Sequence, residues 1–287
     1  MSADTYYRMS IQNQWVERIQ NLPVLPQVAM RITERMQSPT ATLQEISDLI
    51  KSDVGLTSKI LKLANSSYYS IPGGVSDVLK ALQYLGFNTI AQIVLTTSVF
   101  GSFRASGIRE FPLSGFWQHS FAVGLVAELT ARNLQYKNPS DCFIGGLMHD
   151  VGKLILLELA PDQLSKIVKH AAEEKISFLK AETSLQLVPH TELGVKLAEH
   201  WRLPASVVSL IRSHHGGGTK PEEILIEWAN VWVHTQKIGN SGNFQSDLTA
   251  EHDELMKKAG LTPSQVKQIE IHFAKEFEKA GALLSGS

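Results

Sequence analysis

The chain has 287 residues, of which 43% are hydrophobic and 19% are charged, and its formal net charge is −1. This is the composition of an ordinary globular protein that is long enough to bury a substantial core. A net charge so close to zero excludes any bulk electrostatic reason for binding nucleic acid or a membrane surface.

The sequence also predicts a cytoplasmic location. Its single cysteine, Cys142, cannot form a disulfide within the chain, which suits a reducing compartment. No apolar run approaches the roughly 20 residues of a membrane span. The first residues do not have the pattern of a signal peptide. We therefore expect no membrane association.

The first part of the chain predicts a series of short helices. Apolar residues recur every fourth position from Val28 over residues 27–37. Thr42 and Glu45 have the spacing of a capping box at the start of a second helix, and a third helix is expected over residues 56–65. A polar segment with Gly107 and Pro112 predicts a boundary near residue 108. We therefore expect one helical subdomain over residues 1–108 and another over residues 109–287.

Two short helices over residues 43–64 raise the possibility of a DNA-binding helix-turn-helix. A recognition helix needs side chains for phosphates and base edges, but Lys59 and Lys62 are the only basic residues on the second helix. With a nearly neutral chain, this pattern favours a plain helical hairpin. No nucleic-acid partner is expected.

The second part of the chain also predicts helices, which makes the expected fold class all-α. One helix over about residues 116–133 carries His119, and the next begins at the pair Asn138-Pro139 and runs into His149. Later helices are expected over residues 154–169 and at the starts marked by Pro189, Pro204, Pro221 and Pro263. The Gly-, Asn- and Ser-rich residues 239–245 predict a mobile loop between the last two.

The adjacent His149 and Asp150 are the most informative residues of this part. A buried imidazole and a buried carboxylate cost free energy unless they are paired or bound to a metal ion. His119 lies 30 residues earlier on the preceding helix, and Gly145 and Gly146 would let the two helices pack closely and antiparallel. Alone, His119 is more simply a core histidine whose ring bonds to a backbone carbonyl.

Several motifs in the first part resemble the HDOD family of bacterial signalling domains. The stretch from Asp53 to Tyr68 contains Leu63-Ala64-Asn65-Ser66. It is followed by Val75-Ser76-Asp77, by a helix-start motif from Ala81 to Gly86, and by a long apolar helix from Ile90 to Phe100. The resemblance covers roughly residues 22–238, with Val54 where the family usually has proline. It implies an all-α protein of two packed helical subdomains, the second a bundle like the HD domain. From the residues themselves, Asn65 is expected to bond to free groups at a helix end rather than to bind a ligand.

The second part is similar to the HD superfamily, and to its HD-GYP branch, which hydrolyses cyclic di-GMP with two or three metal ions. This resemblance implies one or two iron, manganese or zinc ions, with Asp150 as a catalytic residue and Lys153 meeting the substrate phosphate. Carried over by position, the metal ligands would be His119, His149, Asp150, His190, His214 and His215.

Three departures from the superfamily pattern weaken the case for an enzyme. Asn230 stands where the last aspartate is expected, residues 216–218 are all glycine where a glutamate and a Gly-Tyr-Pro loop are expected, and Ser114-Gly115 replaces an acidic residue before His119. Fewer carboxylates mean weaker metal binding and no evident base for a water molecule.

The sequence therefore predicts a non-hydrolytic regulatory or scaffolding HDOD module that binds a signalling protein or a nucleotide. The alternative is a metal-dependent phosphodiesterase acting on a cyclic nucleotide at the same six residues. A third reading keeps these residues as a polar core whose groups are satisfied by carbonyls and water without a metal ion.

Overall fold

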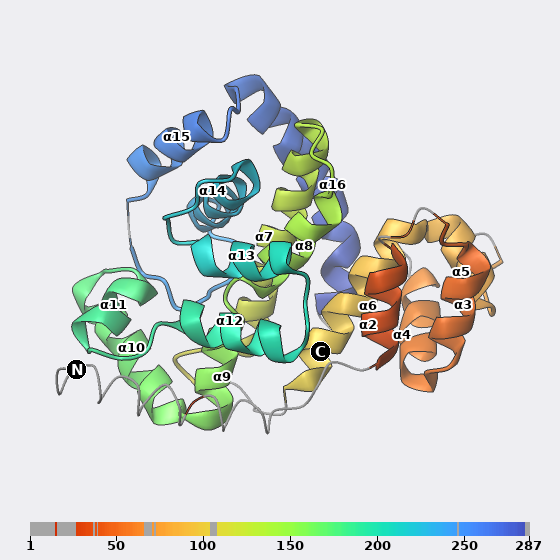
Figure 1. Cartoon of the computed structure of the whole chain (residues 1–287), viewed down its shortest axis with the longest axis horizontal. Coiled ribbons are helices and arrows are strands. Elements are labelled where there is room, and N and C mark those ends of the chain that lie inside the picture. The colour runs from red at the N-terminus through yellow and green to blue at the C-terminus, as the bar shows by residue number, and fades with distance from the viewer. Residues whose placement is uncertain are drawn as a thin grey trace. The chain divides into compact units, whose positions relative to one another are not determined.

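The computed structural model describes residues 15, 27–36, 38, 40–65, 71, 73–103, 108–245 and 247–284 (Figure 1). Within these ranges the chain is built from helices and contains no strand, apart from an isolated bridge between Ile108 and Phe111. The all-α prediction is therefore confirmed. Tyr68 of the sequence motif lies outside the described residues.

Contacts divide the chain into two units. One is formed by Phe103–Ala274 together with Met1–Pro23, and we call it the C-terminal unit. The other is formed by Val24–Ser102 together with Lys275–Ser287, and we call it the N-terminal unit. The subdomain boundary near residue 108 remains a prediction, because a division by contacts is not a test of independent domains.

The N-terminal unit is a small helical bundle with an aliphatic core. Buried isoleucines from three successive helices, Ile32, Ile46 and Ile60, lie in this core. The Thr42 side chain accepts from the Glu45 backbone and the Glu45 carboxylate accepts from the Thr42 backbone, so the predicted capping box is confirmed. Its helices are α2 (Gln27–Met36), α3 (Leu43–Lys51), α4 (Val54–Ala64), α5 (Val78–Leu85) and α6 (Phe87–Ser102).

Asn65 joins the end of α4 to the segment before α5. Its amide nitrogen donates to the carbonyls of Leu61, at 2.9 Å, and of Val75, at 2.7 Å, while its amide oxygen accepts from the Val75 nitrogen at 2.7 Å. One side chain thus joins the last turn of α4 to the backbone of Val75 in the segment before α5. The expected role of Asn65 at a helix end is confirmed.

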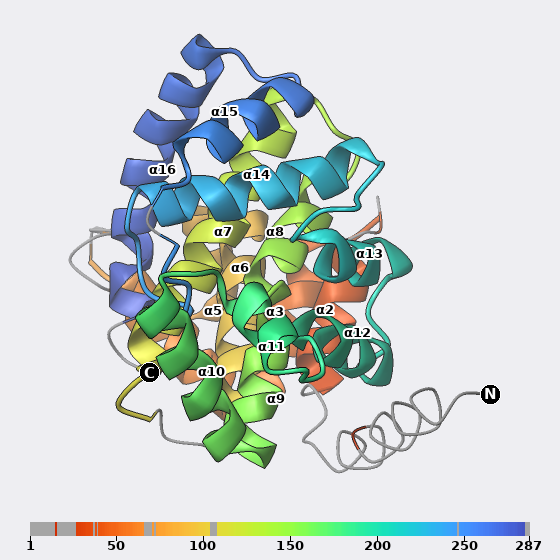
Figure 2. The ribbon, with the colours of Figure 1, turned by 90° about the vertical axis from the view of Figure 1, so that its left-hand side faces the viewer.

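The C-terminal unit contains the remaining helices of the described residues. In Figures 1 and 2, α7 and α8 lie side by side with α14 beside them. Helices form where the sequence predicts them within the described residues, but the prediction of one helix over residues 154–169 is wrong, because the first helix ends at Leu159 and Pro161 begins a second. The helix α15 was not predicted, because its only buried residue is Leu255 and it has no apolar face. The helices are α7 (Leu113–Asn133), α8 (Pro139–Met148), α9 (Val151–Leu159), α10 (Pro161–Glu174), α11 (Phe178–Ser184), α12 (His190–His200), α13 (Ala205–Ser213), α14 (Pro221–Thr235), α15 (Thr249–Lys258) and α16 (Pro263–Leu284). The last part of α16, from Lys275, belongs to the N-terminal unit.

Two glycines allow α7 and α8 to touch along their backbones. A Cβ atom on Gly146 would lie 2.7 Å from the Cα of Gly124, and one on Gly124 would lie 2.8 Å from the carbonyl oxygen of Phe143. The helices run antiparallel, as expected, since later residues of α7 meet earlier residues of α8. Gly145 was assigned to the same contact wrongly, because it faces Leu210 of α13 instead.

Two expected helix starts differ in detail. The helix after Asn138 begins at Pro139 as predicted, but the Asn138 side chain makes no capping bond. At the start of α14 the carboxylate that accepts from the backbone of Thr219 and Lys220 belongs to Glu223, one residue later than the sequence pattern suggested.

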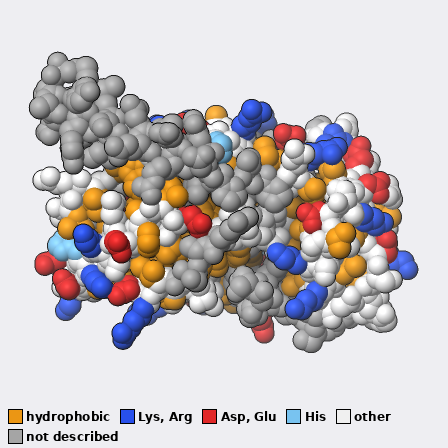
Figure 3. Space-filling model, turned by 90° about the horizontal axis from the view of Figure 1, so that it is seen from below, with side chains coloured by type: hydrophobic (Ala, Val, Ile, Leu, Met, Phe, Trp, Pro, Cys, Tyr) orange, Lys and Arg blue, Asp and Glu red, His pale blue; other side chains and the backbone are white. Residues whose placement is uncertain are grey.

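Among the described residues, no single helix is both long and apolar enough to cross a membrane. The helical segments Val78–Leu85 and Thr89–Ser102 would be long and apolar enough for a membrane span only if they are counted together. The chain bends by 114° between them. On the face shown in Figure 3, the visible charged side chains of both signs are interspersed.

Candidate metal centre

The six residues predicted as metal ligands come together in the C-terminal unit. They come from α7, from the junction of α8 and α9, from the start of α12 and from the end of α13. At most 1% of the surface of each of the first five is exposed, and His215 is half-buried. Two groups of candidate ligand atoms share Asp150: His119, His149 and Asp150 form one, and Asp150, His190, His214 and His215 form the other.

The junction of α8 and α9 places His149 and Asp150 at the centre. His149 follows the last residue of α8 and Asp150 precedes the first residue of α9, so the backbone turns where these side chains project. Gly152 then lets α9 approach α12, because a Cβ atom at this position would overlap the carbonyl oxygen of His190. A backbone contact between two helices thus brings His190 next to Asp150.

Three imidazole nitrogens and one carboxylate oxygen converge in the group that contains His190. The Nε2 atom of His190 lies 3.3 Å from that of His214 and 3.2 Å from that of His215. Asp150 Oδ1 lies 3.1 Å from His190 Nε2 and 3.4 Å from His214 Nε2. Yet Asp150 Oδ1 accepts no well-aligned hydrogen bond, which is costly for a buried carboxylate oxygen.

Hydrogen bonds at Nδ1 fix which nitrogen of His149 and of His214 faces Asp150. The Nδ1 atom of His149 donates to the Gly146 carbonyl at 2.6 Å, and that of His214 donates to the Ile211 carbonyl at 2.8 Å. Because a carbonyl can only accept, each Nδ1 carries the proton and each Nε2 of the neutral ring keeps its lone pair. This is the arrangement that metal-binding histidines have.

Glu182 supports His190 in the same way. Its carboxylate accepts from His190 Nδ1 at 2.7 Å and from the His190 backbone nitrogen at 2.8 Å, and its side chain is fully buried. The sequence analysis missed Glu182, which stands eight positions before His190 on the separate helix α11. No sequence spacing signals this pairing, because a turn between the two helices creates it.

Burial keeps most of these imidazoles neutral. It lowers the pKa of His214 to about 3 and that of His234 to about 3. It also lowers the pKa values of His119 and His215 well below the ordinary value, and neighbouring imidazoles add to the effect. Neutral imidazoles are the form that binds metal ions.

Asp150 and His190 depart from this trend. Burial alone would raise the pKa of Asp150, but the neighbouring His149 and Lys153 hold it well below its ordinary value. Burial opposes the charged form of His190, and the Glu182 carboxylate nevertheless raises the pKa of this histidine. A metal ion on His190 Nε2 would have to displace any proton that this nitrogen carries.

Lys153 lies inside the cluster rather than at its surface. Its ammonium group donates to Asp150 Oδ2 at 2.7 Å and to the Ser241 carbonyl at 2.9 Å, and it lies 4.5 Å from the centroid of the Phe178 ring. The predicted contact of Lys153 with a substrate phosphate remains a prediction. The segment 239–245 that holds Ser241 is packed rather than loose, since Ser241 is fully buried and Asn240 donates to the Gly115 carbonyl at 2.9 Å.

The other side of the cluster contains Asn230 and His234, both on α14. The Nε2 atom of His119 lies 3.0 Å from the Asn230 amide oxygen, so the residue that replaces the expected aspartate does reach the site. His234 packs on His119 with ring centroids 4.4 Å apart. The i,i+4 spacing of Asn230 and His234 was visible in the sequence, but only the structure shows that both face His119.

The donor set of the His190 group fits a transition-metal ion. Atoms bound to one ion at a metal–nitrogen distance of about 2.1 Å lie roughly 3.0–3.4 Å from one another in octahedral or tetrahedral coordination. Four of the six distances between ligand atoms in this group are 3.1–3.4 Å, and all four atoms lie within 4.8 Å of one another. Three imidazole nitrogens and one carboxylate suit iron, manganese or zinc.

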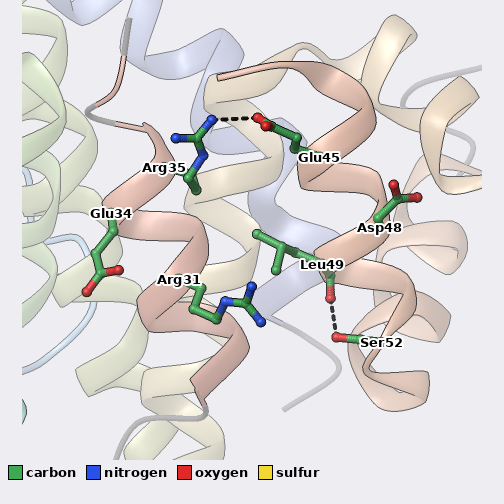
Figure 4. Close-up of a pocket in the computed structure, with 7 residues that line it drawn as sticks. All are labelled: Arg31, Glu34, Arg35, Glu45, Asp48, Leu49 and Ser52. Carbon is green, nitrogen blue, oxygen red and sulfur yellow. Dashed lines mark hydrogen bonds and ion pairs between the residues drawn. The ribbon is translucent and has the colours of Figure 1, made fainter. Parts of the chain in front are cut away.

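A second feature is a groove of about 430 Å³ in the N-terminal unit, between α2 and α3 (Figure 4). Arg35 donates to Glu45 across it at 2.6 Å, and Arg31 extends into it from α2. The lining mixes both charge signs and includes one apolar residue, Leu49. It does not resemble an apolar pocket with a few convergent polar groups, which small-molecule sites usually are.

The fold and the cluster together define a class of protein: an all-helical protein with an HD-type cluster of histidines around one aspartate. The model of the HDOD domain family matches residues 22–216 of this sequence, and the chain belongs to the HDOD family. The match ends before Asn230 and His234.

A protein of Treponema pallidum (strain Nichols) with no assigned function is 28% identical over 208 residues. The aligned region covers 72% of this chain and 40% of that protein, so this chain spans less than half of its relative.

Solved structures of HDOD and related proteins share the fold. An HDOD domain protein of unknown function from Geobacter sulfurreducens superposes with a TM-score of 0.79 at 23% identity, covering 97% of this chain and 99% of that one. A protein provisionally assigned as a phosphohydrolase, from Shewanella amazonensis SB2B, has a TM-score of 0.71 at 20% identity, covering 94% and 97%. At these identities the comparison shows the fold alone.

Proposed function

We propose that this chain is a regulatory HDOD module whose C-terminal unit holds a transition-metal ion and does not hydrolyse phosphodiesters. The observation that carries the proposal is the convergence of three Nε2 atoms and Asp150 Oδ1 within 3.1–3.4 Å of their neighbours. Asp150 Oδ1 accepts no well-aligned hydrogen bond, and a buried carboxylate oxygen in this state is costly unless a cation binds it. The residues that would hold the ion are Asp150, His190, His214 and His215.

The surroundings of the cluster favour binding over catalysis. A bound ion of this type could lower the pKa of a water molecule or polarise a phosphoryl oxygen. The chain, however, offers Asn230 in place of a carboxylate, and it directs the Lys153 ammonium toward Asp150 and Ser241 instead of toward solvent. Only 1% of Lys153 and none of His119 is exposed, which supports a binding role for the cluster over a catalytic one.

The module would act by binding a signalling protein or a nucleotide in the cytoplasm, with the metal ion as a structural or ligand-sensing element. The alternative function is a metal-dependent phosphodiesterase acting on a cyclic nucleotide, with Asp150 and Lys153 as its catalytic residues. The presence of all four ligands of the His190 group favours that alternative, and Asn230 disfavours it.

Metal content tests the proposal. Protein purified without chelators or metal-affinity resin should contain iron, manganese or zinc by elemental analysis. His190→Ala should lose most of it, because the variant removes a central ligand. His272→Ala is the matched control, since His272 is exposed on α16 and should leave the content unchanged.

Turnover separates the two functions. The metal-loaded protein should not hydrolyse cyclic di-GMP or bis(p-nitrophenyl) phosphate above the level of His190→Ala. Turnover that disappears in His190→Ala would establish the phosphodiesterase alternative. A folded wild-type protein that binds no metal ion would leave the cluster as a polar core and overturn the proposal.

A further inference from the structure

Asp150 separates the cluster into two halves, one at each carboxylate oxygen. Oδ1 faces the half formed by His190, His214 and His215, and Oδ2 faces the half formed by His149 and His119. The halves differ in the number of ligand atoms and in whether the Asp150 oxygen of that half is paired with the Lys153 ammonium group.

The Oδ1 half offers the larger set of ligand atoms, and its imidazole nitrogens hydrogen-bond to one another at 3.2–3.3 Å. Oδ1 accepts no well-aligned hydrogen bond although it is buried, and the neutral His214 ring directs its Nε2 lone pair toward it. Glu182 holds His190 from behind and adds a second buried carboxylate close to any cation bound there. Two nearby anionic groups favour a divalent cation in a buried site.

The Oδ2 half already contains a cation. The Lys153 ammonium group donates to Oδ2 at 2.7 Å, which pairs the negative charge of this oxygen inside the protein. A second positive charge beside Lys153 would be repelled at a position where both groups are buried. The His149 Nε2 atom, 3.2 Å from Oδ2, is the one unpaired ligand atom that directly borders this oxygen.

Asn230 further weakens the Oδ2 half. Its amide oxygen lies 3.0 Å from His119 Nε2, so this nitrogen is paired with a neutral side chain. The remaining His119 nitrogen, Nδ1, has no hydrogen-bond partner and is the only other atom that His119 can offer. An amide in this place supplies no negative charge to offset a second metal ion.

We infer that the chain binds a single metal ion, held by Asp150 Oδ1, His190, His214 and His215, and that Lys153 and Asn230 keep the His119 half metal-free. This inference rests on the proposed function and specifies which part of the cluster performs it. Lys153 thus acts as an internal cation that replaces a second metal ion.

Zinc titration of two histidine variants tests this assignment. Protein stripped with a chelator and dialysed should take up about one equivalent of Zn²⁺ per chain, measured by elemental analysis and by competition with a chromophoric chelator. His119→Ala should keep this equivalent and its affinity. His215→Ala should lose tight binding, and because His215 is only half-buried, its truncation should leave the fold intact by circular dichroism.

Asn230→Asp supplies an independent test that removes no ligand. The new carboxylate should pair with His119 and allow a second, weaker equivalent of Zn²⁺ to bind, whereas Asn240→Asp, in the packed loop, should not. Any of three results would overturn the inference but leave the proposed metal-binding function standing. These are two equivalents of zinc in the wild-type protein, loss of zinc in His119→Ala with retention in His215→Ala, and a single equivalent in Asn230→Asp. Absence of zinc from the folded wild type would overturn the proposed function as well.

Discussion

At the scale of single residues, the cluster depends on residues that are not themselves candidate metal ligands. Glu182, Gly146 and Ile211 each supply an acceptor to the Nδ1 atom of one histidine, through a carboxylate or a backbone carbonyl. These bonds fix the tautomer and orientation of His190, His149 and His214, and they leave Nε2 as the free ligand atom. Of the three acceptors, only the one from Glu182 can be changed by substituting a side chain.

Glu182→Gln should therefore weaken metal binding without removing a ligand. The amide cannot offer the negative charge that favours His190 as it binds a cation, and we expect an affinity about 10–100-fold lower. The Zn²⁺ dissociation constant measures this effect. Glu174→Gln is the control, because Glu174 is exposed at the end of α10. Equal affinities for the two variants would show that Glu182 does not position His190.

At the scale of helices, close backbone contacts set the distances within the cluster. Gly146 against Gly124 brings α8 onto α7, and Gly152 against His190 brings α9 onto α12. Ring centroids of His119 and His149 consequently lie 5.3 Å apart, although the residues belong to different helices. Any side chain at these glycines has to push two helices apart.

Gly146→Ala should lower the stability of the protein and at the same time displace the histidines of the cluster, because both depend on the contact between α7 and α8. The added Cβ would meet backbone atoms of Gly124 and Val123 at 2.7–2.9 Å, and backbone cannot give way as a side chain can. Overpacking of this kind costs about 1–3 kcal/mol, visible as a lower midpoint of thermal unfolding by circular dichroism. Gly101→Ala is the matched control in α6, where a Cβ meets nothing within 4 Å and should stabilise the helix by roughly 0.5–1 kcal/mol. Equal melting temperatures for Gly146→Ala and the wild type would refute the close contact.

At the scale of the whole molecule, the buried histidines couple stability to pH. In the metal-free protein, His119, His214, His215 and His234 all have lowered pKa values in the folded state. A group whose folded pKa is depressed stabilises the folded state above its unfolded pKa and loses this contribution as pH falls toward the folded value. His190, whose pKa is raised, acts in the opposite direction.

The metal-free protein should therefore become less stable below about pH 6.5, the ordinary pKa of histidine. Each histidine with a lowered pKa contributes about 1.4 kcal/mol per pH unit between that value and its folded pKa, which is about 3 for His214 and His234. Urea unfolding at pH 7 and pH 5, followed by tryptophan fluorescence, measures this, because all five tryptophans lie in the C-terminal unit.

His234→Gln should reduce the loss of unfolding free energy between pH 7 and pH 5 by about the contribution of one histidine. The substitution removes one of the histidines with a lowered pKa and leaves every proposed ligand of the ion in place. His272→Gln, at an exposed site, should keep the wild-type slope. If stability were unchanged between pH 7 and pH 5, the histidines could not be buried in neutral form.

Local patterns in the sequence were sufficient to predict most of the helices, and the resemblance to the HD superfamily supplied the candidate ligands of the cluster. The Thr42 and Glu45 pair, the prolines before α12, α13 and α14, and the apolar spacing of α2 and α7 depend on neighbours within one or two turns, which is why they could be read without a structure. The motif around Asn65 and the positions of His149 and Asp150 likewise identified the family that the domain match confirmed.

Only the tertiary structure decided how the cluster is completed. The pairing of Glu182 with His190, the enclosure of Lys153 by Asp150 and Ser241, and the contact of Asn230 with His119 join residues 3 to 111 positions apart. Such contacts depend on the crossing of helices and on backbone contacts at glycines, for which a single sequence carries no periodic signal. The sequence by itself determined which residues could bind a metal ion, and the packing of the helices determined which of their atoms are free to do so.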